Sequence, residues 1–187
     1  MSEPSAIERF DAAIDALFDQ IRGVPAFDRL FYTASELGDW SLIWHLLGAS
    51  QGVLLCDGLE RAVRLSAYMG IESALVNGGI KSLFRRERPI FEAERPHKLR
   101  QPLTSSFPSG HASAAFTAAA LLSDGTRAKP LFYAIAGIVA LSRIHVRIHH
   151  ASDVMGGALV GLVLGALAKR FWALGDPPFG LEEWLGR

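Results

Sequence analysis

Basic, hydroxyl and imidazole side chains that could do chemistry are concentrated in three short segments of this sequence. The segments are 81–89 (KSLFRRERP), 107–111 (FPSGH) and 142–153 (SRIHVRIHHASD). Each lies next to an uncharged apolar run, so each is expected at the end of a helix. Fixed cations and free backbone N–H groups bind anions, and neutral histidines can act as nucleophiles or transfer protons. The pattern therefore indicates chemistry on an anion at helix ends.

The first two segments could supply the binding groups of such a site. Lys81 and Arg88 follow an apolar helix that Pro89 helps to end. Ser109 can cap the helix that begins after it, and Gly110 lets the backbone approach a ligand closely. Alone, a basic run at a helix end can be a solvated collar, and a capped turn can be purely structural. The functional interpretation therefore rests on all three segments together.

The third segment combines histidines with a carboxylate. His149 and Asp153 are four residues apart, so on a helix they share a face, and Asp153 can fix the imidazole tautomer. His145 extends the spacing to H-x3-H-x3-D, which also suits Zn²⁺ or a two-metal helical bundle. A metal-binding helical membrane protein is therefore the alternative function. It leaves Lys81 and Arg143 without a purpose and places cations beside a divalent metal. A non-catalytic membrane scaffold is a third reading.

In order, the three segments contain the motifs K-x6-RP, PSGH and SR-x5-H-x3-D. On these motifs the chain resembles the type-2 phosphatidic acid phosphatase superfamily over about residues 40–172. That family includes lipid phosphate phosphatases, isoprenyl-diphosphate phosphatases, soluble bacterial acid phosphatases and vanadium haloperoxidases. The resemblance implies an α-helical bundle built around one phosphate site.

The resemblance also implies a role for each matching residue. Five groups would hold the phosphoryl oxygens: the side chains of Lys81, Arg88 and Arg143, the Ser109 hydroxyl and the Gly110 N–H. His149 would be the nucleophile and Asp153 would orient it. His111 would protonate the leaving group and then activate the water that cleaves the phosphohistidine.

No metal and no cofactor are expected at this site. A loose phosphoryl-transfer transition state needs fixed positive charge, and three cations with a helix N-terminus supply it. The expected function is hydrolysis of a lipid phosphate, or of an isoprenyl phosphate or diphosphate, through a phosphohistidine. The substrate stays open among phosphatidate, phosphatidylglycerophosphate, a polyprenyl phosphate or diphosphate and a prenyl-linked sugar phosphate, which share the same head chemistry.

The elements that position these segments are expected to be helices only. Apolar residues recur at helical spacing over 6–22, where Ser5 and Glu8 form a capping box, so an amphipathic helix is predicted there. This helix is expected to pack against the rest of the bundle. Five uncharged stretches follow, the second broken only by Glu72: 40–56, 65–80, 101–123, 130–142 and 154–168. If the corresponding helices alternate in direction, all three polar segments emerge on one side.

Most of these stretches are shorter than the roughly 20 residues that a full membrane span needs. Five of them in one chain nevertheless favour an integral, multi-pass membrane protein with about five short embedded helices. Small residues at Gly157, Gly161 and Gly165 are spaced for close helix contact. The membrane face that carries the site, the exact number of spans and the oligomeric state are not specified by the pattern.

Composition limits the remaining possibilities. The 187 residues are expected to form one domain (1–187), with a catalytic core over 40–172 and a tail over 175–187. Nineteen basic and nineteen acidic residues give a net charge of zero, which argues against a nucleic-acid binder. The single cysteine, Cys56, cannot form an intrachain disulfide and is expected to be a small buried hydrophobic residue.

Overall fold

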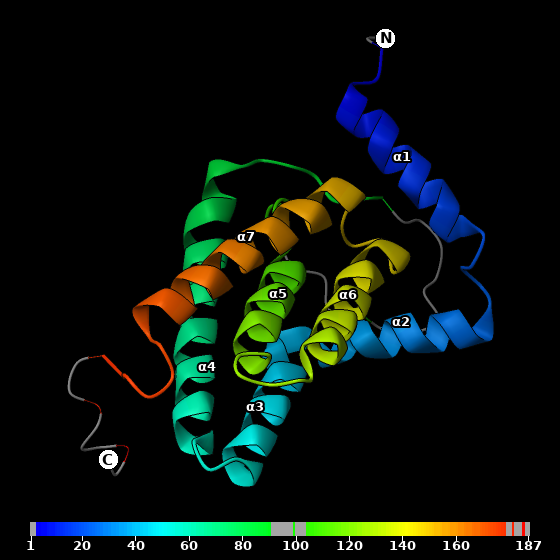
Figure 1. The fold of residues 1–187 in the computed structure, drawn as a ribbon. Helices are drawn as coiled ribbons and strands as arrows, with labels where there is room; N and C mark the ends of the chain where they lie inside the picture. The colour runs from blue at the N-terminus through cyan, green and yellow to red at the C-terminus, as the bar shows by residue number, and fades with distance from the viewer. Residues whose placement is uncertain (1–2, 91–98, 100–103, 179–180, 182–184, 186–187) are drawn as a thin grey trace.

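The computed structural model describes residues 3–90, 99, 104–178, 181 and 185, and this part of the chain is helical without a β-strand (Figure 1). The α-helices are α1 (Ala6–Asp19), α2 (Pro25–Leu37), α3 (Leu42–Leu54), α4 (Gly58–Ser73), α5 (Gly110–Leu122), α6 (Lys129–His145) and α7 (Ala151–Phe171). The shorter elements are the 3₁₀ helices η1 (Asp39–Ser41) and η3 (Ile80–Leu83) and the π-helix η2 (Ala74–Gly79). The all-α prediction is therefore confirmed.

Helix α5 forms the centre of the bundle and contacts α4, α6 and α7 (Figure 1). Its alanines are largely buried, and the glycines of α7 lie directly against its backbone. A Cβ atom added to Gly157 would lie 2.3 Å from the carbonyl oxygen of Ser109, and one added to Gly161 would lie 2.3 Å from that of Ser113. Small residues at these positions therefore let the beginnings of α5 and α7 come together.

Two helices differ from the sequence expectation. Helix α2 was not predicted, because Gly23 and Pro25 were interpreted as the end of the preceding helix, whereas Pro25 occupies the first turn of α2. Helix α4 begins at Gly58, seven residues before the predicted start at 65. The charges that obscured its first turns are buried and paired: Arg64 Nη2 lies 2.8 Å from Asp124 Oδ2, and Glu60 accepts a hydrogen bond from the indole of Trp172.

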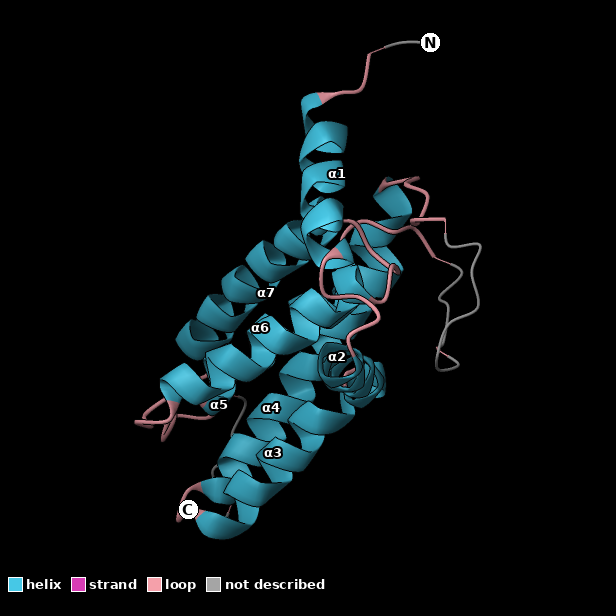
Figure 2. Ribbon diagram, turned by 90° about the vertical axis from the view of Figure 1, so that its right-hand side faces the viewer, coloured by secondary structure: helices cyan, strands magenta, loops and turns pink. Residues whose placement is uncertain are grey.

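The predicted amphipathic helix is present as α1, with the capping box of Ser5 and Glu8 formed, but it ends at Asp19. None of its residues is fully buried, although Ile14 and Phe18 pack against the bundle. Figure 2 shows α1 extending away from the other helices. The packing prediction therefore holds for the half of the helix from Asp11 onward, where Asp11 also accepts a hydrogen bond from the backbone N–H of Ser152. The prediction for Cys56 is wrong, because its side chain is exposed.

Among the described helices, α7 alone is long and apolar enough to cross a membrane, and α5 is a shorter apolar helix. Many large apolar side chains on the outer faces of the bundle are exposed, including Val53 and Leu54 on α3 and Met155 and Leu159 on α7. A contiguous exposed apolar surface is unfavourable in water. Five spans remain a prediction.

Candidate active site

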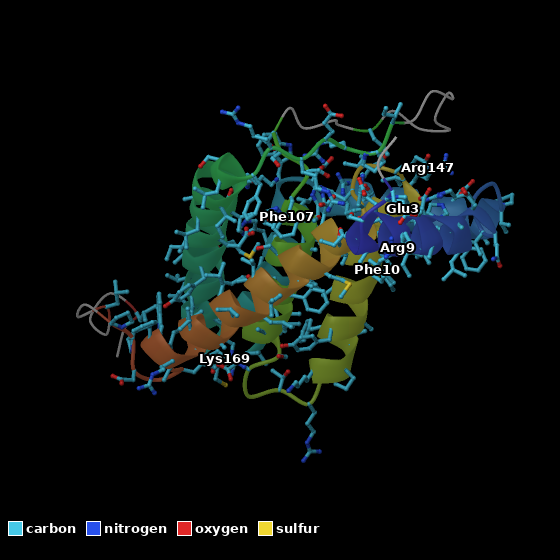
Figure 3. The ribbon with its side chains drawn as sticks, turned by 90° about the horizontal axis from the view of Figure 1, so that it is seen from above. Glu3, Arg9, Phe10, Phe107, Arg147 and Lys169 are labelled. Atoms are coloured by element: carbon cyan, nitrogen blue, oxygen red, sulfur yellow. The ribbon has the colours of Figure 1, made fainter. Side chains whose placement is uncertain are left out.

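The three polar segments meet at one end of the bundle, as the alternating topology predicts. The backbone N–H of Ser109, before α5, donates to the carbonyl of Asp153 in the first turn of α7 at 3.0 Å. Arg88, after η3, reaches the turn between α6 and α7 with a hydrogen bond to the carbonyl of Ile148 at 3.0 Å. Figure 3 shows Lys169, in the last turn of α7, at the opposite end of that helix from α1.

A cavity of about 570 Å³ opens at this end. Four of the predicted site residues line it: Lys81, Gly110, His111 and His149. Three of the other four predicted residues, Ser109, Arg143 and Asp153, are at most 1% exposed, and the fourth, Arg88, is half-buried beside His149. The structure therefore brings the predicted residues together, with four of them on the cavity surface.

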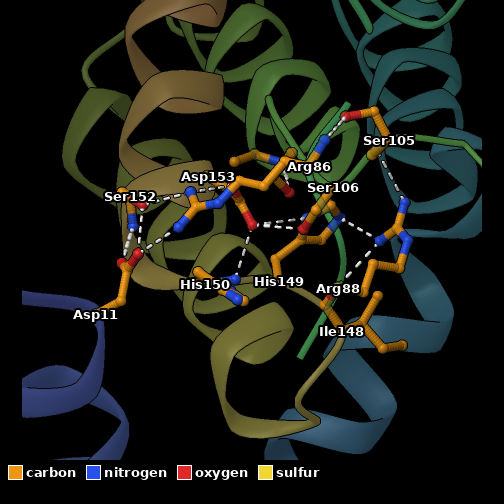
Figure 4. A network of polar contacts seen from close by, with 12 residues as sticks. Asp11, Arg86, Arg88, Ser105, Ser106, Ile148, His149, His150, Ser152 and Asp153 are labelled. Carbon is orange, nitrogen blue, oxygen red and sulfur yellow. Dashed lines mark hydrogen bonds and ion pairs between the residues drawn. The ribbon is translucent and has the colours of Figure 1, made fainter. Parts of the chain in front are cut away.

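His149 lies in the turn before α7, with its two ring nitrogens in different surroundings (Figure 4). Nδ1 lies 3.6 Å from Asp153 Oδ2 and 3.4 Å from the Ser106 hydroxyl. Nε2 lies 3.1 Å from Nη1 of Arg88. Because a guanidinium can only donate, Nε2 carries the lone pair and Nδ1 carries the proton. The lone pair of the neutral ring therefore lies on the nitrogen that faces Arg88.

The pKa of His149 is lowered to about 3, chiefly by burial and further by the charges of Arg143 and Arg88, while its hydrogen bond to Asp153 opposes the shift. The imidazole is therefore neutral at physiological pH. The prediction that His149 and Asp153 share a helix face is wrong, because α6 ends at His145 and α7 begins at Ala151. They approach each other because His150 is the N-cap of α7 and Asp153 reaches back to its backbone N–H at 2.8 Å.

The carboxylate of Asp153 is fully buried and is held by groups that the sequence pattern did not single out (Figure 4). Oδ2 accepts from the Ser106 hydroxyl at 2.6 Å, and Oδ1 accepts from Arg86 Nη1 at 2.6 Å. Arg86 also donates to Asp11 of α1 at 2.5 Å, and Asp11 accepts from the N–H and hydroxyl of Ser152. Arg86 sits in the basic run 81–89, but the sequence gives no signal that separates it from its neighbour.

Lys81 is 6% exposed, and its Nζ donates to Asn77 Oδ1 at 3.0 Å. Burial lowers the pKa of Lys81 to about 8, and the nearby charge of Arg88 acts in the same direction. A Cβ atom on Gly110 would lie 3.4 Å from this Nζ and 3.2 Å from Asn77 Oδ1. Glycine at 110 therefore leaves room for the ammonium group beside the first turn of α5.

His111 has a carboxylate partner that sequence reasoning missed. Its Nε2 lies 3.1 Å from Oδ1 of Asp39, which belongs to η1. Asp39 lies 72 residues earlier in the chain, so no local motif connects the two. Each histidine of the site is thus placed beside an aspartate, His149 beside Asp153 and His111 beside Asp39.

Arg143 and Ser109 are held from behind the cavity. Nη1 of Arg143 donates to the hydroxyl of Ser35 on α2, and the charge of Arg143 lowers the pKa of His149 and Lys81. Ser109 caps α5 as predicted, with its hydroxyl accepting from the Ala112 N–H at 3.5 Å. The unpredicted helix α2 therefore supports a predicted site residue.

The geometry removes the basis of the metal-binding alternative. His145 ends α6, and its Nε2 lies 2.7 Å from Asp28 Oδ1, with the ring packed against Phe31. The turn after it passes through Arg147, whose φ of 52° breaks the helix. His145, His149 and Asp153 therefore do not form one helical ladder. Within the described residues, no group of three or more His, Cys, Asp or Glu side chains could hold a metal ion.

Comparison with known proteins gives consistent matches. Residues 61–174 match the PAP2 superfamily. A decaprenylphosphoryl-5-phosphoribose phosphatase of Mycobacterium tuberculosis is 41% identical over 88 residues, which cover 47% of this chain and about half (49%) of that protein. The protein of the same name from Mycolicibacterium smegmatis is 32% identical over 150 residues, covering 79% of this chain and 80% of that protein.

A solved structure shares the fold. The crystal structure of a transmembrane PAP2-type phosphatidylglycerolphosphate phosphatase from Bacillus subtilis superimposes with a TM-score of 0.66 at 27% identity. The superposition covers 90% of this chain and 87% of that one.

Proposed function

This chain belongs to the PAP2 superfamily, and from that premise we propose that it hydrolyses a phosphorylated lipid without a metal ion, through a phosphohistidine at His149. The observation that carries the proposal is the setting of His149. Its Nδ1 faces the buried carboxylate of Asp153 and its Nε2 faces the guanidinium of Arg88, at the wall of an open cavity. A neutral imidazole held this way is prepared to attack an anion that Arg88 has bound.

In the first step the Nε2 lone pair attacks phosphorus and the ester P–O bond breaks. The proton that the departing oxygen needs comes from His111, which lies at the same cavity wall. The Ser106 hydroxyl accepts from Nδ1–H and donates to Asp153, whose carboxylate, 3.6 Å from Nδ1, stabilises the positive charge that develops on the ring. His111, now neutral, takes a proton from water. The hydroxide attacks phosphorus, the P–N bond breaks, and inorganic phosphate leaves.

The charge required by the transition state comes from the chain itself. Lys81 and Arg88 lie beside the nucleophile, and Arg143 contributes from behind the wall. Free N–H groups at the start of α5, near Gly110, add positive potential. In other phosphoryl-transfer enzymes metal ions supply this positive charge. Here the cations of the chain supply it, so the proposed reaction needs no metal ion.

The relatives guide the choice of substrate. Two are described as decaprenylphosphoryl-5-phosphoribose phosphatases and the structural neighbour as a phosphatidylglycerolphosphate phosphatase. The substrate named for each of these proteins carries its phosphate on a lipid. We therefore propose that the substrate of this chain is a lipid phosphate, or an isoprenyl phosphate or diphosphate. The apolar span α7 and the exposed apolar side chains of the bundle support an integral, multi-pass membrane location.

Purified protein in detergent provides the test. Release of phosphate from phosphatidate or a prenyl phosphate should be insensitive to EDTA and inhibited by vanadate, which adopts the five-coordinate geometry of the transition state. The His149→Ala variant should be inactive, while His150→Ala, at the adjacent position, should keep measurable turnover. Loss of activity in EDTA that Zn²⁺ or Mg²⁺ restores would contradict the proposal.

A further inference from the structure

The cavity is larger than a phosphate group requires. Phosphate has five heavy atoms, the bulk of two or three waters at about 30 Å³ each, whereas the cavity holds about 570 Å³. Lys81, Gly110, His111 and His149 occupy one part of the wall. The rest includes seven polar residues: Ser41, His45, Ser66, Glu72, Ser73, Asn77 and Thr104. A second compartment, in which these polar groups alternate with the apolar side chains of Trp40, Met69 and Ala114, therefore adjoins the phosphate position.

Glu72 is the unexpected member of this compartment. It shares the inner face of α4 and η2 with Leu65, Met69 and Val76, and like them it is almost fully buried, at 2% exposed. Its Oε1 accepts from the Ser113 hydroxyl of α5 at 2.5 Å. A buried carboxylate is costly, and beside an anion site it also repels the ligand. A carboxylate at this position is suited to a ligand that donates hydrogen bonds to it.

The open side of the compartment is also polar. Ser66, Gly70, Ser73 and Asn77 follow one another at spacings of four, three and four residues, so they form one stripe along α4 and η2. All four line the cavity, and the stripe ends at Asn77, which accepts the hydrogen bond from Lys81. A ligand whose phosphate lies at Lys81 would have its neighbouring atoms along this stripe and facing Glu72.

We propose that this compartment is a subsite for the hydroxyl groups of a sugar or polyol that carries the scissile phosphate, with Glu72 as its specificity-determining residue. The inference rests on the proposed function and narrows its substrate class. The Glu72 carboxylate accepts hydrogen bonds from substrate hydroxyls, and Ser66 and Ser73 exchange hydrogen bonds with others. In its ionised form Glu72 also repels a second phosphate at that position, so a phosphomonoester is preferred over a diphosphate.

A matched substrate pair tests this subsite. Octyl ribofuranoside 5-phosphate and its 2,3-dideoxy counterpart share the alkyl chain and the primary phosphate and differ only in two hydroxyls. We expect kcat/KM to favour the hydroxylated compound by at least about tenfold, since a site built around hydroxyls rejects analogues that lack them. Free ribose 5-phosphate forms a third arm: equal turnover assigns a soluble sugar phosphate as the source, and much lower turnover assigns a lipid-linked one.

Variants separate the subsite from a general effect on the enzyme. In Glu72→Gln the side-chain oxygen can still accept the hydrogen bond from Ser113. This variant should bring the ratio of kcat/KM for the hydroxylated compound to kcat/KM for the dideoxy compound close to one. It should also raise turnover of a prenyl diphosphate. Glu60→Gln makes the same change at the other end of α4, where the carboxylate binds Trp172 and Gly175, and it should leave the ratio unchanged.

The outcomes for the two proposals differ. Equal kcat/KM for the matched pair in the wild-type protein, or an equal loss on both substrates in Glu72→Gln, overturns the subsite while the phosphatase assignment stands. Absence of turnover on both substrates, on phosphatidate and on prenyl phosphate overturns the proposed function and the subsite with it.

Discussion

The protonation of Lys81 should set the alkaline limit of activity on an activated aryl phosphate, whose leaving group needs no proton from His111. Its pKa is lowered to about 8 by burial and by Arg88, and the charged form is the one that binds phosphate. With that pKa, about 90% of the free enzyme is charged at pH 7 and about 10% at pH 9. A charge-assisted hydrogen bond contributes about 1.5–3 kcal/mol, so the neutral amine retains at most about a tenth of the activity. Because the neutral form retains up to about a tenth of the activity, we expect kcat/KM to fall by about five- to ninefold between pH 7 and pH 9.

The assay is the pH dependence of kcat/KM, which reports ionisations of the free enzyme, on an activated aryl phosphate. Its phosphate is already a dianion at pH 7, and its leaving group does not depend on protonation by His111. Lys81→Arg keeps the charge at all of these pH values, so its kcat/KM should be lower but should lose the alkaline decrease. Lys169→Arg, at the far end of α7, should retain the wild-type profile. If kcat/KM of Lys81→Arg decreases at high pH as it does in the wild-type protein, the decrease does not come from the ionisation of Lys81 and the reasoning is refuted.

Three further predictions concern the site, and two of them concern residues that the structure adds to it, Arg86 and Asp39. Arg86→Gln removes the donor to Asp153 and should lower kcat by about 10–100-fold, as loss of an orienting partner does elsewhere, whereas Arg85→Gln, at an exposed neighbouring position, should have little effect. Asp39→Asn should slow substrates with high-pKa alcohol leaving groups more than an activated aryl phosphate, because the proton from His111 matters less for the latter; equal losses on both would exclude this role. His111→Ala should keep phosphorylation by the aryl phosphate but accumulate the phosphoenzyme, which rapid quenching with a radioactive substrate would measure.

The convergence of the site could be predicted because it depends on local signals. Three polar segments beside apolar runs, in helices of alternating direction, must meet at one end, and the capping of α5 by Ser109 follows from residue type alone. The glycines of α7 similarly indicated a close helix contact, which forms against the backbone of α5. These features require only neighbours in the sequence and the period of a helix.

Features that depend on distant residues could not be predicted. The partners of His111 and Asp153 lie in η1 and in the loop before α5, and nothing local marks Asp39 or Ser106 as such. Helix α4 was predicted too short because its charged first turns look solvent-exposed until their partners in the fold are known. The position of His149 also differs from the prediction. His149 approaches Asp153 because His150 is the N-cap of α7, and the two residues do not share a helix face.

Identification of the covalent intermediate tests the central claim most directly. Protein mixed with a ³²P-labelled lipid phosphate, quenched in alkali and digested should yield one labelled peptide with an acid-labile, base-stable phosphate on His149. The label should be absent from His149→Ala. With a ³²P-labelled aryl phosphate, which phosphorylates His149 without the proton from His111, it should be stronger in His111→Ala, where hydrolysis is slowed. Label on His111 or His145, or full activity in His149→Ala, would contradict the account.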